Sequence, residues 1–217
     1  MDYLFLDFGN VICYPTTGDW FITPFFEQYI KDHNLSKEDI LSSIKNYGAL
    51  LDGQYTTMEE EYEMFYTLYK SIFDKLNYKI RKSDVEVIAD DITYSTTKYQ
   101  LFRDIREELI ELKKKFNLIL LSDNWPCGEY LMNAWMLDQY FKKMYISSYY
   151  GIKKDNPDFF RVPMNEFGLR PQNITFVDDN DVPLDTANSL GIKVYKMDRF
   201  KNIQQDKYPV IHDLKSI

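Results

Sequence analysis

Apolar residues follow two different patterns along the chain, and the change of pattern divides it into two parts. Residues 3–6 form a short apolar run closed by Asp7-Phe8-Gly9-Asn10, which predicts a buried strand that ends in a turn. From about residue 20 to residue 99 the pattern is helical, and no convincing strand is predicted. One apolar helix face in that stretch, with steps of three and four residues, consists of Tyr62, Phe65, Tyr69, Phe73 and Leu76.

Pairs of polar residues three positions apart are predicted to open helices in this stretch. The pairs are Ser36 with Asp39, Thr57 with Glu60, and Ser83 with Glu86.

After residue 99, helices and strands alternate. The predicted strands cover residues 118–121, 144–146, 174–177 and 192–195, and the predicted helices cover residues 101–116, 125–140 and 184–190, with a further helix opening at Pro157. Pro163 is expected to kink or shorten that helix. Such alternation predicts an α/β fold, with a parallel sheet that helices cover on both faces and right-handed crossovers. A helical insertion interrupts this core directly after its first strand.

Composition narrows the classes of protein that the chain can belong to. Its 217 residues suit one domain, or a core domain with a smaller insertion. A net charge of -8 and the lack of a basic stripe argue against nucleic-acid binding. The N-terminal apolar stretch is broken at Asp7, which excludes a signal peptide and a membrane span and predicts a cytoplasmic protein. Cys13 and Cys127 are expected to be free thiols in a reducing compartment.

Polar residues with possible chemistry follow three of the predicted strands. Asp7, Ser122 and the pair Asp178-Asp179 each come directly after an apolar strand. In an open α/β sheet, ligands bind outside the carboxyl ends of the strands. Each residue alone could be a turn residue, and Ser122 could be a helix N-cap. Together they form a group of acids that would repel one another unless a divalent cation with oxygen ligands, such as magnesium, lay among them.

The order of these residues resembles the four signature motifs of the haloacid dehalogenase superfamily. The motifs are Asp7-Phe8-Gly9-Asn10-Val11, Ser122, Lys154 within residues 151–160, and Phe176-Val177-Asp178-Asp179-Asn180. The resemblance covers nearly the whole chain. It implies a Rossmann-like core of residues 1–14 and 100–217 and a helical cap of residues 15–99. The Gly-Asn form of the first motif most resembles the subgroup that includes bacterial glucose-1-phosphate phosphatases.

The resemblance implies a magnesium-dependent phosphatase that acts on a small phosphorylated metabolite such as a sugar phosphate. Asp7 would attack phosphorus and form an aspartyl-phosphate, Ser122 would donate a hydrogen bond to a phosphoryl oxygen, and Lys154 would neutralise charge. The expected magnesium ligands are Asp7, the Gly9 carbonyl, Asp178 and Asp179. The residues expected to bind the substrate are Asn10, Asp123, Asn124, Asp19 and Trp20. No membrane partner is implied, and the chain would be a monomer or a homodimer.

The chain departs from the family pattern in three places. Gly9 stands where most phosphatases of the superfamily carry a second aspartate, the general acid and base. Asp123 stands where asparagine is common, and Pro183 where the fourth motif often has Asp or Asn; Asp181 or Asp185 would have to compensate.

Two other functions stay open. One is a metal-independent 2-haloacid dehalogenase, against which the pair Asp178-Asp179 speaks, and the other is a catalytically idle binding or regulatory protein.

Overall fold

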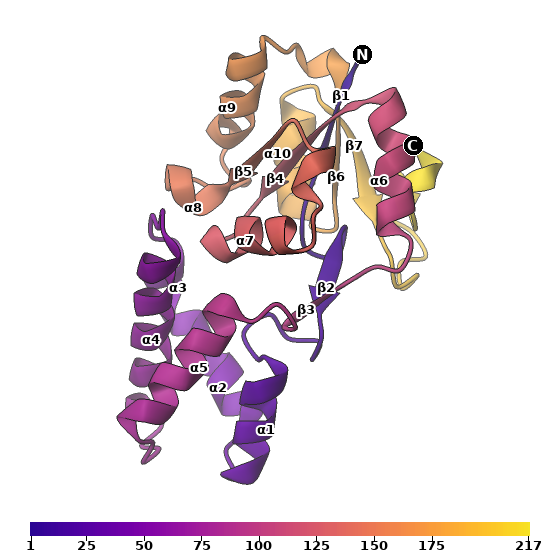
Figure 1. Cartoon of the computed structure of the whole chain (residues 1–217). Coiled ribbons are helices and arrows are strands. Elements are labelled where there is room, and N and C mark those ends of the chain that lie inside the picture. The colour runs from indigo at the N-terminus through magenta and orange to yellow at the C-terminus, as the bar shows by residue number, and fades with distance from the viewer. The chain divides into compact units, whose positions relative to one another are not determined.

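The computed structural model describes all 217 residues, which form two compact units. The core unit consists of Met1–Tyr14 and Leu101–Ile217, and the helical unit consists of Pro15–Gln100. Two short strands, β2 (Cys13–Pro15) and β3 (Tyr99–Leu101), pair where the chain passes from one unit to the other and back (Figure 1).

The core unit is built on one parallel sheet of six strands in the order β5-β4-β1-β6-β7-β8. Leu6 of β1 lies opposite Leu120 on one side and Val177 on the other, so the first strand of the chain lies inside the sheet. The predicted α/β fold is confirmed. The strands are β1 (Tyr3–Leu6), β4 (Asn117–Ser122), β5 (Lys143–Ile146), β6 (Ile174–Asp178), β7 (Lys193–Met197) and β8 (Val210–Ile211).

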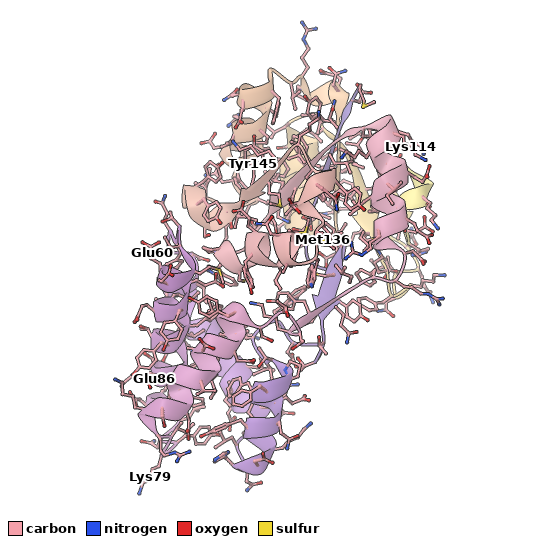
Figure 2. The ribbon with its side chains drawn as sticks, in the orientation of Figure 1. Glu60, Lys79, Glu86, Lys114, Met136 and Tyr145 are labelled. Atoms are coloured by element: carbon pink, nitrogen blue, oxygen red, sulfur yellow. The ribbon has the colours of Figure 1, made fainter.

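Helices cover both faces of this sheet, which explains why its strands are apolar on both sides. On one face, Phe5 of β1 and Phe176 of β6 belong to a buried cluster that includes residues of helices α9 (Pro157–Phe167) and α10 (Asp181–Ser189). Tyr145 belongs to the same cluster, whereas Lys114 is exposed on α6 (Figure 2). Helix α6 (Ile105–Lys115) packs against β4. The other core helices are α7 (Pro126–Ala134), α8 (Ser147–Tyr150), η2 (Asp138–Tyr140), η3 (Pro171–Asn173) and η4 (Leu214–Ser216).

The helical unit contains only helices between residues 16 and 98, as predicted. Thr57 and Glu60 form a complete capping box at the start of α4, and the Ser36 hydroxyl accepts the Asp39 N–H at the start of α2. None of the helices in the protein is long and apolar enough to cross a membrane. The helices of this unit are α1 (Pro24–Asp32), α2 (Lys37–Ile44), η1 (Lys45–Tyr47), α3 (Gly48–Leu51), α4 (Met58–Lys75) and α5 (Lys82–Tyr94).

One predicted helix start in the helical unit is wrong. Ser83 does not cap a helix, because α5 already begins at Lys82, after Arg81. The Arg81 guanidinium pairs with the Asp84 carboxylate at 2.9 Å, across a first turn that begins two residues earlier than predicted.

Two predicted helices in the core unit also differ from the structure. The helix expected over residues 125–140 ends at Ala134, because Met136 adopts a left-handed backbone with φ 54° and the chain turns there. Pro163 does not end α9, which continues to Phe167. Burial of Pro163 together with Phe159 and Phe160 offsets the hydrogen bond that proline cannot make.

A buried ion pair that the sequence did not predict ties the C-terminal segment to the loop after β1. The Arg199 guanidinium contacts both carboxylate oxygens of Glu108, at 3.0 and 2.6 Å, and both side chains are almost fully buried. Arg199 also donates two hydrogen bonds to the Val11 carbonyl, and Glu108 accepts the Leu214 N–H. The Glu108 carboxylate therefore links three distant segments, which contain Val11, Arg199 and Leu214.

We expect Glu108→Gln to lower the free energy of unfolding by about 3 kcal/mol, because it leaves the buried Arg199 charge without its counter-charge. The matched control is Glu107→Gln on the same helix, where the exposed carboxylate contributes less than about 1 kcal/mol. Urea denaturation of both variants provides the measurement. Equal stabilities of the two variants would contradict this role of Glu108.

Candidate active site

The candidate site lies at the carboxyl edge of the parallel sheet, where the strand order reverses. From β1 the chain proceeds outward through β4 and β5, and then crosses to β6 on the other side of β1. Such a switch point opens a crevice between the loops of neighbouring strands. Asp7 follows β1 at this point, while Ser122 ends β4 and Asp178 ends β6. Three adjacent strands thus deliver the predicted polar residues to one place.

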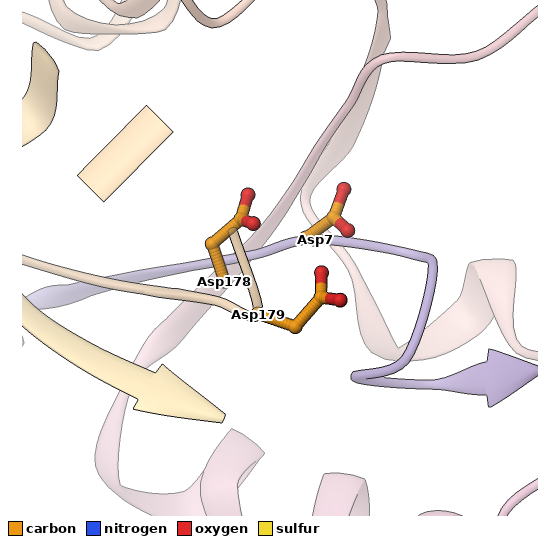
Figure 3. Close-up of side chains that lie close together, drawn as sticks. All are labelled: Asp7, Asp178 and Asp179. Atoms are coloured by element: carbon orange, nitrogen blue, oxygen red, sulfur yellow. The ribbon is translucent and has the colours of Figure 1, made fainter. Parts of the chain in front are cut away.

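Lys154 lies at the centre of the site. Its Nζ is 2.5 Å from Asp7 Oδ1 and 2.6 Å from Asp178 Oδ2, and all three side chains are buried. The other oxygen of Asp178 accepts the Asn180 N–H at 2.8 Å. Carboxylate oxygens of Asp7, Asp178 and Asp179 lie within 4.8 Å of one another, and the three side chains point to the same side of the loops (Figure 3).

The site holds more negative than positive charge. Burial raises the pKa of Asp178 to about 8 despite the opposing effect of Lys154, and burial with the nearby Asp7 raises the pKa of Asp179. Burial alone would lower the pKa of Lys154, but the charges of Asp178 and Asp7 raise it by more than burial lowers it. The pKa is therefore raised overall, and this lysine carries its charge. One ammonium therefore faces three carboxyl groups, and the raised pKa values of Asp178 and Asp179 reflect the cost of ionising all of them together.

The loop after β4 contributes Ser122, Asp123 and Asn124. Ser122 is buried and is not a helix N-cap, because α7 starts after Trp125. The Asp123 carboxylate accepts the backbone N–H of Lys154 at 2.9 Å, so it fixes the segment that carries the lysine. Its pKa is raised, chiefly because the surrounding protein shields the carboxylate from water although the side chain is partly exposed.

Asn124 shapes the beginning of α7. Its side-chain oxygen accepts the Trp125 N–H at 2.8 Å, and its amide nitrogen would lie only 2.6 Å from a Cβ at residue 128, so Gly128 leaves room for this side chain. The role of Asn124 in substrate binding stays a prediction.

The loop after β1 brings Gly9 and Asn10 to the acidic group. Gly9 does not have a positive φ, and no protein donor bonds its carbonyl. Asn10 has a left-handed backbone with φ 53° and donates a hydrogen bond from Nδ2 to Asp179 Oδ2 at 2.8 Å. We predicted that Asn10 binds substrate and did not foresee this contact with a residue 169 positions away. The one sequence feature that indicated this contact is the position of Asn10 in the same motif as Asp7.

Asp181 and Asp185, the acids near Pro183 that would have to compensate for the missing fourth-motif residue, are both in ion pairs. Lys196 Nζ lies 2.5 Å from Asp181 Oδ1. Lys207 and Tyr208 both bond Asp185 and hold the pKa of its carboxyl below the usual range, which makes Asp185 a poor proton donor at neutral pH.

The predicted substrate residues Asp19 and Trp20 lie in the helical unit. Asp19 forms an ion pair with Lys37 at 2.6 Å, and the Trp20 ring packs edge-on against Tyr99. Their role in substrate binding stays a prediction.

Comparison with known proteins identifies the family. The family model of the haloacid dehalogenase-like hydrolases matches residues 35–197, which is most of the chain. The chain belongs to this hydrolase family. The predicted family is therefore confirmed, whereas the glucose-1-phosphate phosphatase subgroup stays a prediction.

The sequence identity between this chain and individual relatives is low. A glyceraldehyde 3-phosphate phosphatase from Pyrococcus furiosus is 28% identical over 113 residues, which is 48% of this chain and 47% of that protein. The chain thus spans about half the length of this curated relative.

Solved structures of the family show the same fold. The HAD-hydrolase YfnB from Bacillus subtilis, in a structure bound to magnesium, superimposes with a TM-score of 0.68 at 14% identity, over 99% of this chain and 96% of that one. A 2-haloacid dehalogenase from Pseudomonas syringae pv. Tomato DC3000 gives a TM-score of 0.68 at 13% identity, over 100% and 96%. Because a 2-haloacid dehalogenase shares this fold, the fold alone does not identify the reaction of this chain.

The acidic group of this hydrolase has the donor chemistry that magnesium requires. Every candidate ligand is an oxygen, from the carboxylates of Asp7, Asp178 and Asp179 and from the unbonded Gly9 carbonyl. Hard divalent cations prefer such oxygen ligands. A divalent cation would also offset the excess negative charge that Lys154 leaves. The residues therefore fit a magnesium site.

We expect Lys154→Met to destabilise the metal-free protein by about 3 kcal/mol, because Asp7 and Asp178 lose their buried counter-charge. Lys153→Met is the control at the neighbouring position. Urea denaturation in chelator measures both variants, and repeating it with magnesium should return part of the loss. A Lys154→Met protein as stable as the control would show that the ion pairs are unimportant.

Proposed function

We propose that the chain is a magnesium-dependent phosphatase that hydrolyses a small phosphorylated metabolite through an aspartyl-phosphate on Asp7. The observation that carries this proposal is the position of the Asp7 carboxylate. It lies directly after the inner strand β1, at the switch point, 2.5 Å from a buried lysine and beside Asp178 and Asp179. A carboxylate held among a cation and oxygen ligands suits nucleophilic attack on a phosphate group.

The proposed reaction has two displacements at phosphorus. The Asp7 carboxylate attacks phosphorus, a bond forms between them, and the bond from phosphorus to the leaving oxygen breaks. The leaving oxygen takes a proton from water and departs as an alcohol. A second water molecule then attacks phosphorus, the bond between phosphorus and the Asp7 oxygen breaks, and inorganic phosphate leaves. The proton lost by this water neutralises the hydroxide left from the first step, and the Asp7 carboxylate is restored.

Lys154 and Ser122 support both steps. The Lys154 ammonium, next to Asp7 Oδ1, neutralises negative charge that gathers on the phosphoryl oxygens. The Ser122 hydroxyl, at the end of the neighbouring strand, donates a hydrogen bond to one of these oxygens. Asp123 acts through the backbone of Lys154 and keeps the lysine in place.

The residues proposed to hold magnesium are Asp7, Asp179 and the Gly9 carbonyl. Asp178 was also predicted to be a magnesium ligand. It is a weaker candidate than the other three, because Lys154 and the Asn180 N–H already bond its two oxygens. When bound, magnesium would polarise the phosphoryl group and screen its charge.

The curated relative supports the proposed substrate class, and the insertion supports a cap over the substrate. The relative from Pyrococcus furiosus is a glyceraldehyde 3-phosphate phosphatase, which supports a small phosphorylated metabolite as substrate. We propose that the helical unit acts as a cap that excludes water and reads the leaving group, with Asp19 and Trp20 among its binding residues.

We expect Asp7→Asn to lower turnover by several orders of magnitude without loss of folding, because the amide keeps the shape but cannot act as the nucleophile. A screen of phosphorylated metabolites with magnesium supplies the assay, and Asp2→Asn, an exposed residue at the start of the same segment, is the control. Chelator should abolish the activity and magnesium should restore it.

The same screen separates the other functions. Near-normal turnover by Asp7→Asn would refute the mechanism. Release of halide from a 2-haloacid in chelator would favour the dehalogenase, and inactivity on every substrate would favour a binding protein.

We expect the rate to depend steeply on the leaving group, because Gly9 provides no proton donor and Asp181 and Asp185 are held in ion pairs. General acid–base help is typically worth about 10²–10⁴ in rate. Aryl phosphates and sugar 1-phosphates should therefore react faster than simple alkyl phosphates. Comparing kcat/KM across a series of leaving-group pKa values tests this, and a flat series would show that a proton donor is present.

A further inference from the structure

The loop between β1 and β2 is closed by its own backbone and presents one side chain at its apex. Phe8 O accepts the N–H groups of Ile12 and Cys13, at 3.0 and 3.2 Å, and Asn10 N donates to Cys13 O at 2.7 Å. Asn10, at the apex, has φ 53°. This left-handed backbone suits asparagine and glycine and few other residues. The loop therefore fixes where the Asn10 side chain begins.

The Asn10 amide leaves one oxygen of Asp179 available. Its Nδ2 donates to Asp179 Oδ2 at 2.8 Å, and Asp179 is the least buried of the three clustered acids. Asp179 makes no ion pair with Lys154, unlike Asp7 and Asp178. The neutral amide is thus the side chain that sets the orientation of this carboxylate, without adding positive charge that would compete with a cation.

The far side of the loop is anchored in the core. Arg199 donates from Nε and Nη2 to the carbonyl of Val11, the residue after Asn10, at 3.1 and 2.9 Å. The Glu108 carboxylate fixes that guanidinium in turn. The amide of Asn10 is therefore held in place before any ligand arrives, as a support for a metal ligand must be.

We propose that Asn10 is a positioning residue for the cation site, which holds Asp179 with Oδ1 directed to the metal. This inference rests on the magnesium site of the proposed function. Groups that orient a ligating carboxylate through a hydrogen bond commonly contribute 10–100-fold to metal affinity, so about that effect is expected here. The assignment replaces the predicted contact of Asn10 with substrate.

Asn10→Gly tests the role, because glycine keeps the left-handed backbone and removes only the amide. The matched control is Asn34→Gly, since Asn34 is exposed and has nearly the same backbone, with φ 52°. Magnesium binding to chelator-stripped protein is measured by isothermal titration calorimetry, and the melting temperature is recorded without metal.

We expect magnesium to bind Asn10→Gly about 10–100-fold more weakly than the unaltered protein. Asn34→Gly should bind it normally, and both metal-free variants should melt at similar temperatures. Unchanged affinity in Asn10→Gly would overturn the inference, and so would an unaltered protein that binds no magnesium. Weakened magnesium binding in a protein that hydrolyses no phosphate ester would sustain the role of Asn10 and refute the phosphatase proposal instead.

Discussion

The contact of Lys154 with Asp7 and Asp178 is the interaction on which the rest of the site depends. A buried ammonium and two buried carboxylates are costly to remove from water unless each charge has close partners. The arrangement meets that requirement only in part, because Asp179 adds a third carboxylate without a second cation. The fold therefore keeps a local excess of negative charge, and a divalent cation is the simplest group that would balance it.

The topology of the sheet makes this concentration of charge possible. Because β1 lies between β4 and β6, residues that are more than a hundred positions apart come together as a matter of strand order. The helical unit is inserted between β2 and β3, beyond the loop that follows Asp7, so all six strands of the sheet come from residues outside the insertion. Conserving this order of strands while varying the insertion is a general route to new specificity on one fold.

The residues at strand ends could be predicted from sequence, whereas the contacts between loops could not. Short apolar runs placed Asp7, Ser122 and Asp178 correctly at the sheet edge, because strand polarity alone determines where they emerge. Lys154 follows no strand and was found only through the family motif. The ion pair of Arg199 with Glu108 leaves no periodic pattern in the sequence, because it depends on how distant loops meet.

The wrongly predicted helix boundaries also result from features that depend on the folded structure. The helix expected up to Tyr140 ends early because Met136 adopts a left-handed backbone, a conformation that methionine seldom adopts and that composition does not reveal. The start of α5 was misplaced because the contact between Arg81 and Asp84 competes with a cap at Ser83. In both places the preference of a few residues was outweighed by contacts that are specific to this structure.

The hydrogen bonds around the site also indicate what kind of catalysis it can support. Asp123 bonds a backbone N–H, Asp179 bonds the Asn10 amide, and Asp181 and Asp185 are in ion pairs. The ion pairs fix Asp181 and Asp185, and the pKa of Asp185 is lowered, so this residue stays ionised. Burial raises the pKa values of Asp123 and Asp179, although their hydrogen bonds oppose that rise. These contacts hold all four acids in fixed positions. In the phosphatase that we propose, fixed charges of this kind would supply preorganised electrostatic stabilisation around the phosphoryl group.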